Sequence, residues 1–219
     1  MSTITLVSTV GFIKPTHTEF IMRSVLNSLR FTLAALATVA LAGSVAAAAD
    51  YKIDAGHTTV LFKIKHLGVA NFYGVFTKSA GTLSYDAATP AKNSLEIIVE
   101  AGSVFTADKK RDGHLKGPDF FNVKQFPTIT FKSTKVTAKT KADGVYEVAG
   151  NLTFHGKTKA VTFDVTKTGE GNDPWGGTRI GFEGKLTISR AAFDVGKTFL
   201  PPALSDDVEL TISIEVIKQ

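Results

Sequence analysis

Hydrophobic and polar side chains alternate with a period of two along most of the chain after residue 50. In residues 60–66, for example, Phe62 and Ile64 alternate with Lys63 and Lys65. Successive side chains of a β-strand point to opposite faces, so this period places the lysines in water and the apolar side chains in a core. The chain is therefore predicted to consist mainly of strands with one buried face.

Eight segments of this kind follow one another, at residues 60–66, 72–85, 95–99, 129–133, 146–154, 161–165, 180–188 and 208–216. The second segment contains several glycines, which we interpret as bends that close a curved sheet. Two short reversals, Asp143 with Gly144 and His155 with Gly156, suit hairpin turns. Eight amphipathic strands with hairpin-length links predict an antiparallel barrel or sandwich.

Residues 117–127 break the alternation. Pro118 suits the first turn of a helix and Pro127 would end one, so we predict one short helix here. No long segment with the helical period of 3.6 follows residue 50, which excludes folds that alternate strands and helices. Residues 50–219 are therefore predicted to form a single all-β domain.

The first 49 residues have a different character. Arg23 and Arg30 precede an uncharged stretch, residues 31–49, that ends in small side chains. This is the pattern of a cleaved secretory signal, with cleavage after Ala48 or Ala49. Met22 makes a more compact start of such a signal than Met1.

A retained membrane anchor is the alternative, because the nineteen uncharged residues of 31–49 could just span a bilayer. Nine of the nineteen are alanine, which is weakly hydrophobic, and this favours cleavage. We therefore expect residues 1–49 to direct export and to be removed.

Charge and cysteine content exclude several classes of protein. Three bases and one acid precede Asp50, so the rest of the chain carries only +3 of the formal net charge of +5. Without clustering, this excess does not predict nucleic-acid binding. The chain has no cysteine, which excludes disulfides, a cysteine-bound metal and a lipidated cysteine. The core alone must stabilise the fold.

The predicted interior is rich in phenylalanine. An eight-stranded barrel is a borderline case, because side chains can fill it or it can hold one small ligand. A packed core explains most of the inward residues, whereas a pocket also needs a few convergent polar groups. The inward phenylalanines are Phe62, Phe76, Phe131, Phe154, Phe163 and Phe182.

Two polar segments, residues 108–115 and 189–194, are the candidates for a pocket mouth. Arg111 and Arg190 are first interpreted as ion-pair partners of nearby aspartates, namely Asp112, Asp119 and Asp194. The more specific interpretation is recognition of a phosphate or another polar head, which suits the arginine fork.

Neither catalysis nor metal binding is predicted. His114 and Asp112 are two residues apart, which does not make an acid–base pair, and no nucleophile motif is present. Four histidines, His57, His66, His114 and His155, could join a carboxylate around a metal only by converging from distant segments.

An ordered series of short motifs runs through the chain after residue 50. The motifs are 51–58 (YKIDAGHT), 62–68 (FKIKHLG), 74–76 (GVF), 111–115 (RDGHL), 119–121 (DFF), 126–134 (FPTITFKST), 150–159 (GNLTFHGKTK) and 173–176 (DPWG). Each motif is weak alone, but their succession covers nearly all of residues 51–219 and resembles the YceI-like family of periplasmic polyisoprenoid-binding proteins. One position departs from the family pattern, because Asp194 follows Phe193 where the family has an aspartate before this phenylalanine.

The resemblance implies a lipocalin-like, eight-stranded antiparallel barrel in the periplasm that carries a polyprenyl phosphate or an isoprenoid quinone. Such a lipid is the only bound group implied, with no other cofactor. A transient contact with the inner membrane and a homodimer stay open as partners. The candidate ligand-binding residues are Phe62, Ile64, His66, Phe76, Arg111, His114, Phe120, Phe131, Phe163, Phe182, Arg190 and Phe193.

Two alternatives remain beside the carrier. The His, Asp and Arg corner could serve quinone-linked redox or lipid-modifying chemistry as an accessory. A barrel packed solid would instead be a binding module for another exported protein.

Overall fold

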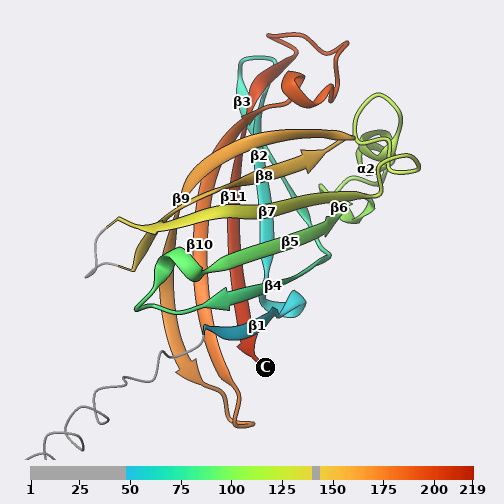
Figure 1. Cartoon of the computed structure of the whole chain (residues 1–219). Helices are drawn as coiled ribbons and strands as arrows, with labels where there is room; N and C mark the ends of the chain where they lie inside the picture. Colours follow the sequence, from blue (N-terminus) through green and yellow to red (C-terminus); the bar gives the residue numbers. More distant parts are fainter. Residues whose placement is uncertain (1–47, 140–143) are drawn as a thin grey trace, which may run out of the picture. The chain divides into compact units, whose positions relative to one another are not determined.

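The computed structural model describes residues 48–139 and 144–219. Within these residues, eleven strands form one antiparallel sheet that closes on itself, because β1 pairs with both β4 and β11 (Figure 1). The strands are β1 (Ala49–Ile53), β2 (Thr59–His66), β3 (Ala70–Phe76), β4 (Ser79–Tyr85), β5 (Ser94–Glu100), β6 (Val104–Phe105), β7 (Thr128–Ala138), β8 (Val145–Phe154), β9 (Lys157–Asn172), β10 (Thr178–Ser189) and β11 (Leu204–Lys218).

These strands occupy eight positions around the barrel. β1 and β2 both pair with β11 and form one position that is interrupted by the 3-10 helix η1 (Ala55–His57). In the same way β3 pairs with β2 and β4 with β1, and β6 pairs with β3 and β5 with β4. The predicted eight-stranded antiparallel barrel is confirmed. The predicted strand 72–85 is in fact two strands, β3 and β4.

Gly81 lies where two strands approach closely. A methyl group at this position would overlap the carbonyl oxygen of Glu96 on β5, and it would lie 2.8 Å from the Cδ1 atom of Ile53. Only a glycine allows this approach, so Gly81 is required where β4 passes between β1 and β5.

The two predicted hairpin turns have different outcomes. β8 and β9 are joined by His155 and Gly156, whose φ angles of 51° and 73° are those of a two-residue hairpin turn, so this prediction is confirmed. At the other predicted turn Gly144 has a φ of 61°, but Asp143 lies outside the described residues. β7 and β8 nevertheless pair as far as Ala138 and Tyr146.

The predicted position of the helix is wrong. The helix is α2 (Lys109–Lys116), and residues 117–127 hold only turns. Asp108 caps α2, because its side chain accepts hydrogen bonds from the backbone N–H groups of Lys110 and Arg111. Pro118 therefore follows the end of the helix instead of opening its first turn.

The core lies inside the barrel and consists of the side chains that the alternation points inward. All six predicted phenylalanines are buried. Rings in contact run across the interior, with centroids 5.8 Å apart for Phe62 and Phe76 and 5.3 Å apart for Phe131 and Phe163. Among the described residues, no helix has both the length and the hydropathy needed to cross a bilayer.

Candidate functional site: an apolar cavity with a polar mouth

The barrel interior holds a cavity of about 460 Å³. A smaller cavity of about 70 Å³ adjoins it. Five aliphatic side chains line both cavities and form the boundary between them. They are Val60, Val99, Ile129, Leu152 and Leu210.

The larger cavity has the size and lining of a ligand pocket. Its volume lies within the roughly 300–1,000 Å³ typical of small-molecule sites. Aromatic and aliphatic side chains of β2, β3, β8, β10 and β11 make most of its wall. Its polar lining residues are His66, Asn71, Arg111, His114 and Arg190.

The structure distributes the predicted site residues over three places. Three of them line the smaller cavity, and one, Phe193, lines neither cavity but packs against Phe154 with ring centroids 5.7 Å apart. Phe131, Phe163 and Phe182 are the residues of the smaller cavity. The larger cavity is lined by Phe62, Ile64, His66, Phe76, Arg111, His114, Phe120 and Arg190.

Several lining residues escaped the sequence analysis. Val208 belongs to the alternation of the last strand and could have been found from it. Phe199, in contrast, belongs to the loop before β11, where no periodic pattern exists. Phe72 pairs with the predicted residue Ile64 of the next strand, and Phe121 follows the predicted residue Phe120 in the sequence.

Arg111 is held at the mouth by Thr106. Its Nε donates to Thr106 Oγ1 at 2.9 Å and its Nη2 to the Thr106 carbonyl at 2.7 Å. The guanidinium lies 4.3 Å from the ring centroid of Phe72, which is a cation–π contact. Within residues 48–139 and 144–219, Nη1 has no hydrogen-bond partner and can donate to a ligand.

His114 is the second polar group at the mouth. Its Nε2 lies 3.1 Å from Asp119 Oδ2, and its ring stands edge-on to Phe120 with centroids 5.1 Å apart. Asp112 does not pair with His114, because its Oδ1 accepts from both the N–H and the hydroxyl of Thr106. His114 is half exposed and lines the cavity, so its ring faces solvent and the interior together.

Arg190 has a structural role. Its side chain is buried, and its five N–H groups donate to five backbone carbonyls. Burial lowers the pKa of this guanidinium. The five acceptors are the carbonyls of Ser205 (2.8 Å), Val195 (3.0 Å), Gly196 (2.6 Å), Leu204 (3.2 Å) and Phe199.

The predicted ion pairs of the two arginines are wrong. Asp112 binds Thr106, Asp119 binds His114, and Asp194 pairs with Lys157 and Lys197. Arg190 instead satisfies carbonyls that would otherwise be buried without a partner. Asp194 itself has a φ of 59°, in the left-handed region.

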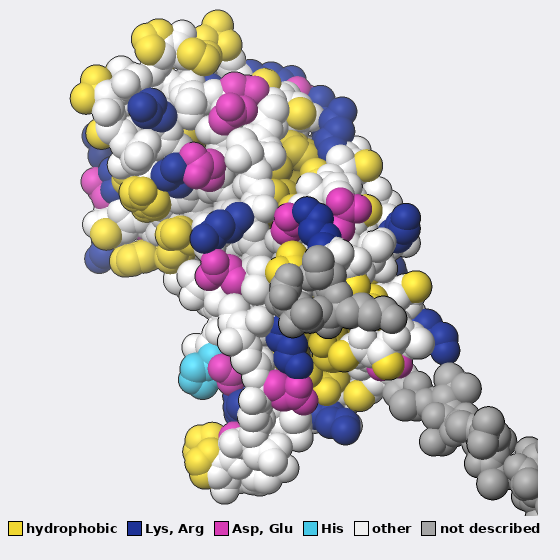
Figure 2. All heavy atoms as spheres, turned by 90° about the vertical axis from the view of Figure 1, so that its left-hand side faces the viewer, with side chains coloured by type: hydrophobic (Ala, Val, Ile, Leu, Met, Phe, Trp, Pro, Cys, Tyr) yellow, Lys and Arg dark blue, Asp and Glu magenta, His cyan; other side chains and the backbone are white. Residues whose placement is uncertain are grey.

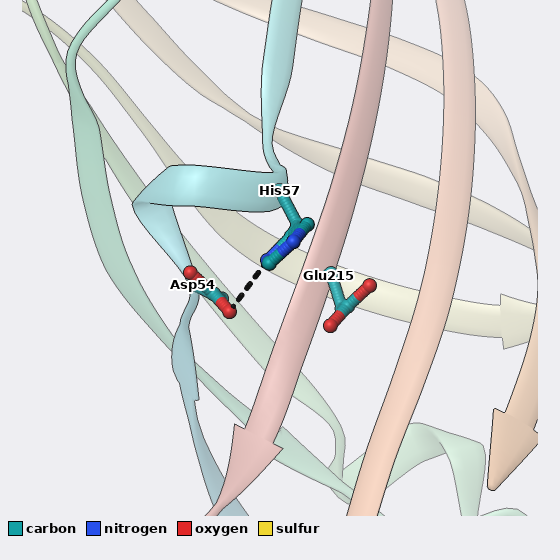
Figure 3. A group of neighbouring side chains, drawn as sticks. All are labelled: Asp54, His57 and Glu215. Carbon is teal, nitrogen blue, oxygen red and sulfur yellow. Dashed lines mark hydrogen bonds and ion pairs between the residues drawn. The ribbon is translucent and has the colours of Figure 1, made fainter. Parts of the chain in front are cut away.

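A separate polar cluster lies away from the cavity, where β1, β10 and β11 meet (Figure 3). His57 Nδ1 lies 2.9 Å from Asp54 Oδ2, and ligand-type atoms of Asp54, His57 and Glu215 all lie within 4.8 Å of one another. Arg179 donates to Asp54 at 2.7 Å, to Glu215 at 2.5 Å and to Asp173 at 2.7 Å. We call these five residues the Arg179 cluster. A guanidinium thus already supplies the positive charge that a metal ion would bring.

The Arg179 cluster makes stability depend on pH. Hydrogen bonds from His57 and then from Arg179 lower the pKa of Asp54 from 3.8 to about 2. A carboxyl with a depressed pKa contributes stability above its ordinary pKa, and this contribution is lost as the pH falls toward 2. The pKa of Asp173 is lowered as well, chiefly by Arg179.

Arg179→Met is therefore expected to lower the Tm by several degrees at pH 7 and by clearly less at pH 2.5. At pH 2.5 the pH approaches the lowered pKa of Asp54, so part of the stabilisation by Arg179 is already lost and the missing guanidinium matters less. Thermal unfolding followed by circular dichroism at both pH values measures the difference. Lys132→Met, which removes one exposed surface pair with Glu96, is the control and should change little at either pH. An equal fall in Tm at both pH values would contradict a pH-dependent contribution of the Arg179 cluster to stability.

Comparison with known proteins gives matches over most of the chain. Residues 51–216 match the model of the YceI-like domain. A Yersinia pestis (strain Pestoides F) protein called "UPF0312 protein" is 46% identical over 179 residues, which cover 81% of this chain and 90% of that one. The crystal structure of the Campylobacter jejuni YCEI protein has a TM-score of 0.64 at 30% identity, and the match covers 72% of this chain and 91% of that one.

A third match is more distant. The structure of a polyisoprenoid binding domain from Saccharophagus degradans has a TM-score of 0.60 and covers 77% of this chain and 98% of that one. Its sequence is 17% identical, so this likeness shows a shared fold.

Proposed function

We propose, from the premise that the chain belongs to the YceI-like domain family, that it binds a long apolar isoprenoid-type lipid inside the barrel. The observation that carries the proposal is the cavity of about 460 Å³ with its apolar wall. Burial of each methylene group contributes about 0.8 kcal/mol, so a long chain gains affinity without many polar contacts.

The polar mouth supports a ligand with a polar head. Arg111 has a donor left for a phosphate or a quinone carbonyl, and His114 lies beside the same cavity. Arg190 does not contribute to this recognition, because its donors are taken by the chain. We therefore propose that a polyprenyl phosphate or an isoprenoid quinone binds with its head near Arg111 and His114.

The carrier role and the periplasmic location are part of the same proposal. They rest on the signal pattern of residues 1–49, most of which lie outside the described residues. The S. degradans protein is called polyisoprenoid binding in its title, and a ligand of the same kind would suit the wall of this cavity. We propose binding without catalysis.

One observation keeps an accessory chemical role as the second candidate. His114 and Asp119 form a pair at 3.1 Å beside the cavity, where a quinone ring would lie. His114→Ala separates the two roles, because a protein that only carries the lipid keeps its function as long as the variant still binds the lipid. A loss of quinone turnover with normal ligand binding would favour the accessory role.

Lipid extraction tests the proposed function. The full chain is expressed with its own N-terminus, purified from the periplasm without detergent, extracted with organic solvent and examined by mass spectrometry. The emptied protein is then titrated with a polyprenyl phosphate, the matching polyprenol and a quinone of equal chain length. We expect one apolar chain per barrel and saturable binding. An empty barrel that binds none of the three lipids would contradict the proposal.

A further inference from the structure

We propose that the end of the barrel at the mouth of the cavity docks on an anionic lipid bilayer through an apolar tip. This inference rests on the proposed function, because it describes how an apolar ligand enters. The apolar tip consists of two adjacent turns, residues 67–69 between β2 and β3 and residues 200–202 ahead of β11. Its side chains are exposed in the isolated chain: Val69 is 83% exposed, Leu200 69% and Leu67 57%.

The two turns form one surface. The Leu67 N–H donates to the Ala203 carbonyl at 3.0 Å, which ties the turns together. Figure 2 shows hydrophobic side chains gathered at the top of the molecule, the end that holds the β2–β3 turn in Figure 1. Exposed leucine and valine at the tips of two joined turns are unfavourable in water and suit the acyl boundary of a bilayer.

The apolar tip continues directly into the cavity. His66 and Ala70 flank the first turn and line the cavity, as do Phe199 and Ala203 on either side of the second turn. A lipid that leaves a bilayer at this point would pass from acyl chains to the barrel wall. Exposure of its apolar chain to water is unfavourable, so a direct passage is strongly favoured.

Cationic side chains without an ion pair favour an anionic bilayer. Within residues 48–139 and 144–219, Lys65 beside the first turn and Lys109, Lys110 and Lys116 on α2 have no ion pair. Lys63 and Lys197 pair with Glu209 and Asp194. Of the other acids nearby, Asp108 caps α2, Asp112 accepts from Thr106, and Asp206 accepts from Ser189, while Asp207 follows Asp206. Cations beside an anionic bilayer strengthen binding to it.

The other end of the barrel supplies a matched control. Trp175, the only tryptophan of the chain, lies in the turn between β9 and β10 and is 84% exposed. This turn adjoins the Arg179 cluster, where Asp173 lies. Trp175 is thus an equally exposed apolar side chain that the proposed orientation keeps in water.

The test is binding of the full exported chain to phosphatidylcholine vesicles with and without phosphatidylglycerol. We expect binding that requires phosphatidylglycerol. The double variant Val69→Asp with Leu200→Asp should lower vesicle partitioning about tenfold or more. Trp175→Asp should leave it unchanged. Fluorescence of Trp175 in the unaltered protein should not be quenched by brominated acyl chains, whereas Val69→Trp in a Trp175→Phe background should be.

A second measurement separates this proposal from the proposed function. A water-soluble short-chain isoprenyl phosphate is titrated in the absence of vesicles, where the double variant should bind like the unaltered protein, because Val69 and Leu200 do not line the cavity. If the protein binds vesicles but its barrel holds no isoprenoid, the proposed function is rejected and the proposal of membrane docking is supported. Vesicle binding that survives the double variant, or that Trp175→Asp abolishes, would overturn the docking. Self-association through the tip without vesicle binding would overturn it too.

Discussion

Replacement of Arg190 by methionine is expected to lower the free energy of unfolding by about 4 kcal/mol, which corresponds to a fall in Tm of about 10 °C. Five carbonyls between Val195 and Ser205 lose their donor at once, and methionine offers none in return. Some of these carbonyls can then reach water, which is why the expected loss is less than the sum of five buried bonds. Urea titration followed by circular dichroism measures the change.

Lys185→Met is the control for this variant. Lys185 lies on the same strand, β10, and its replacement removes the same charge, but its side chain is exposed and, in the part of the chain that the structure describes, pairs only with Glu183. Its removal should change the free energy of unfolding by less than about 1 kcal/mol. If both variants behave alike, the carbonyl network does not stabilise the loop as described.

Replacement of Ile64 by tryptophan is expected to weaken ligand binding about 50-fold and to leave the Tm of the empty protein unchanged or raised. Ile64 lies on the inward face of β2 and lines the larger cavity but not the smaller one. The indole would take the space of about three methylene groups of the ligand, each worth about 0.8 kcal/mol. In the empty protein the same ring fills a void, which does not destabilise the core.

Leu61→Trp makes the same kind of change on the outer face of β2. Leu61 is one residue from Phe62 and points away from the interior, so its replacement should leave the affinity for polyprenyl phosphate unaltered. Isothermal titration compares the two variants. Unaltered affinity in Ile64→Trp would place the ligand outside the larger cavity.

The sequence predicts the barrel well, because the period of two is a local signal. It identified Phe131, Phe163 and Phe182 as inward, and all three are buried in the structure. The breaks within the eight positions are not local. η1 separates β1 from β2, and the two strands share one position only because both pair with the long strand β11, whose residues lie more than a hundred positions away.

The helix was misplaced although its signals are in the sequence. Asp108 ahead of a run of helix-forming residues is a capping signal, and Gly117 with Pro118 is a stop signal. Pro118 by itself suits the first turn of a helix as well as the residues just after its end. Asp108 decides between the two.

The polar part of the site was harder to predict than its wall. A sequence shows that Arg111 and Arg190 are arginines near aspartates, but it does not show which oxygens surround each guanidinium. Arg190 lies among carbonyls that a loop folds around it, whereas Arg111, among the described residues, donates hydrogen bonds to Thr106 alone. Two arginines that look alike in the sequence thus differ in the number of donors that they offer to a ligand.

If the barrel binds a lipid as proposed, the way in which α2 is attached separates the affinity for that lipid from its rate of exchange. α2 has no fully buried residue, and it is held to the mouth by Thr106 and the pair of His114 with Asp119. Elements with few buried contacts open with low free energy, without unfolding of the whole domain. On the proposed function, the barrel wall sets how tightly a lipid is held at equilibrium. The opening of α2 sets how long the lipid stays, so the residence time can change by substitutions of α2 residues that do not line the cavity, such as Lys109, and that leave the equilibrium constant untouched.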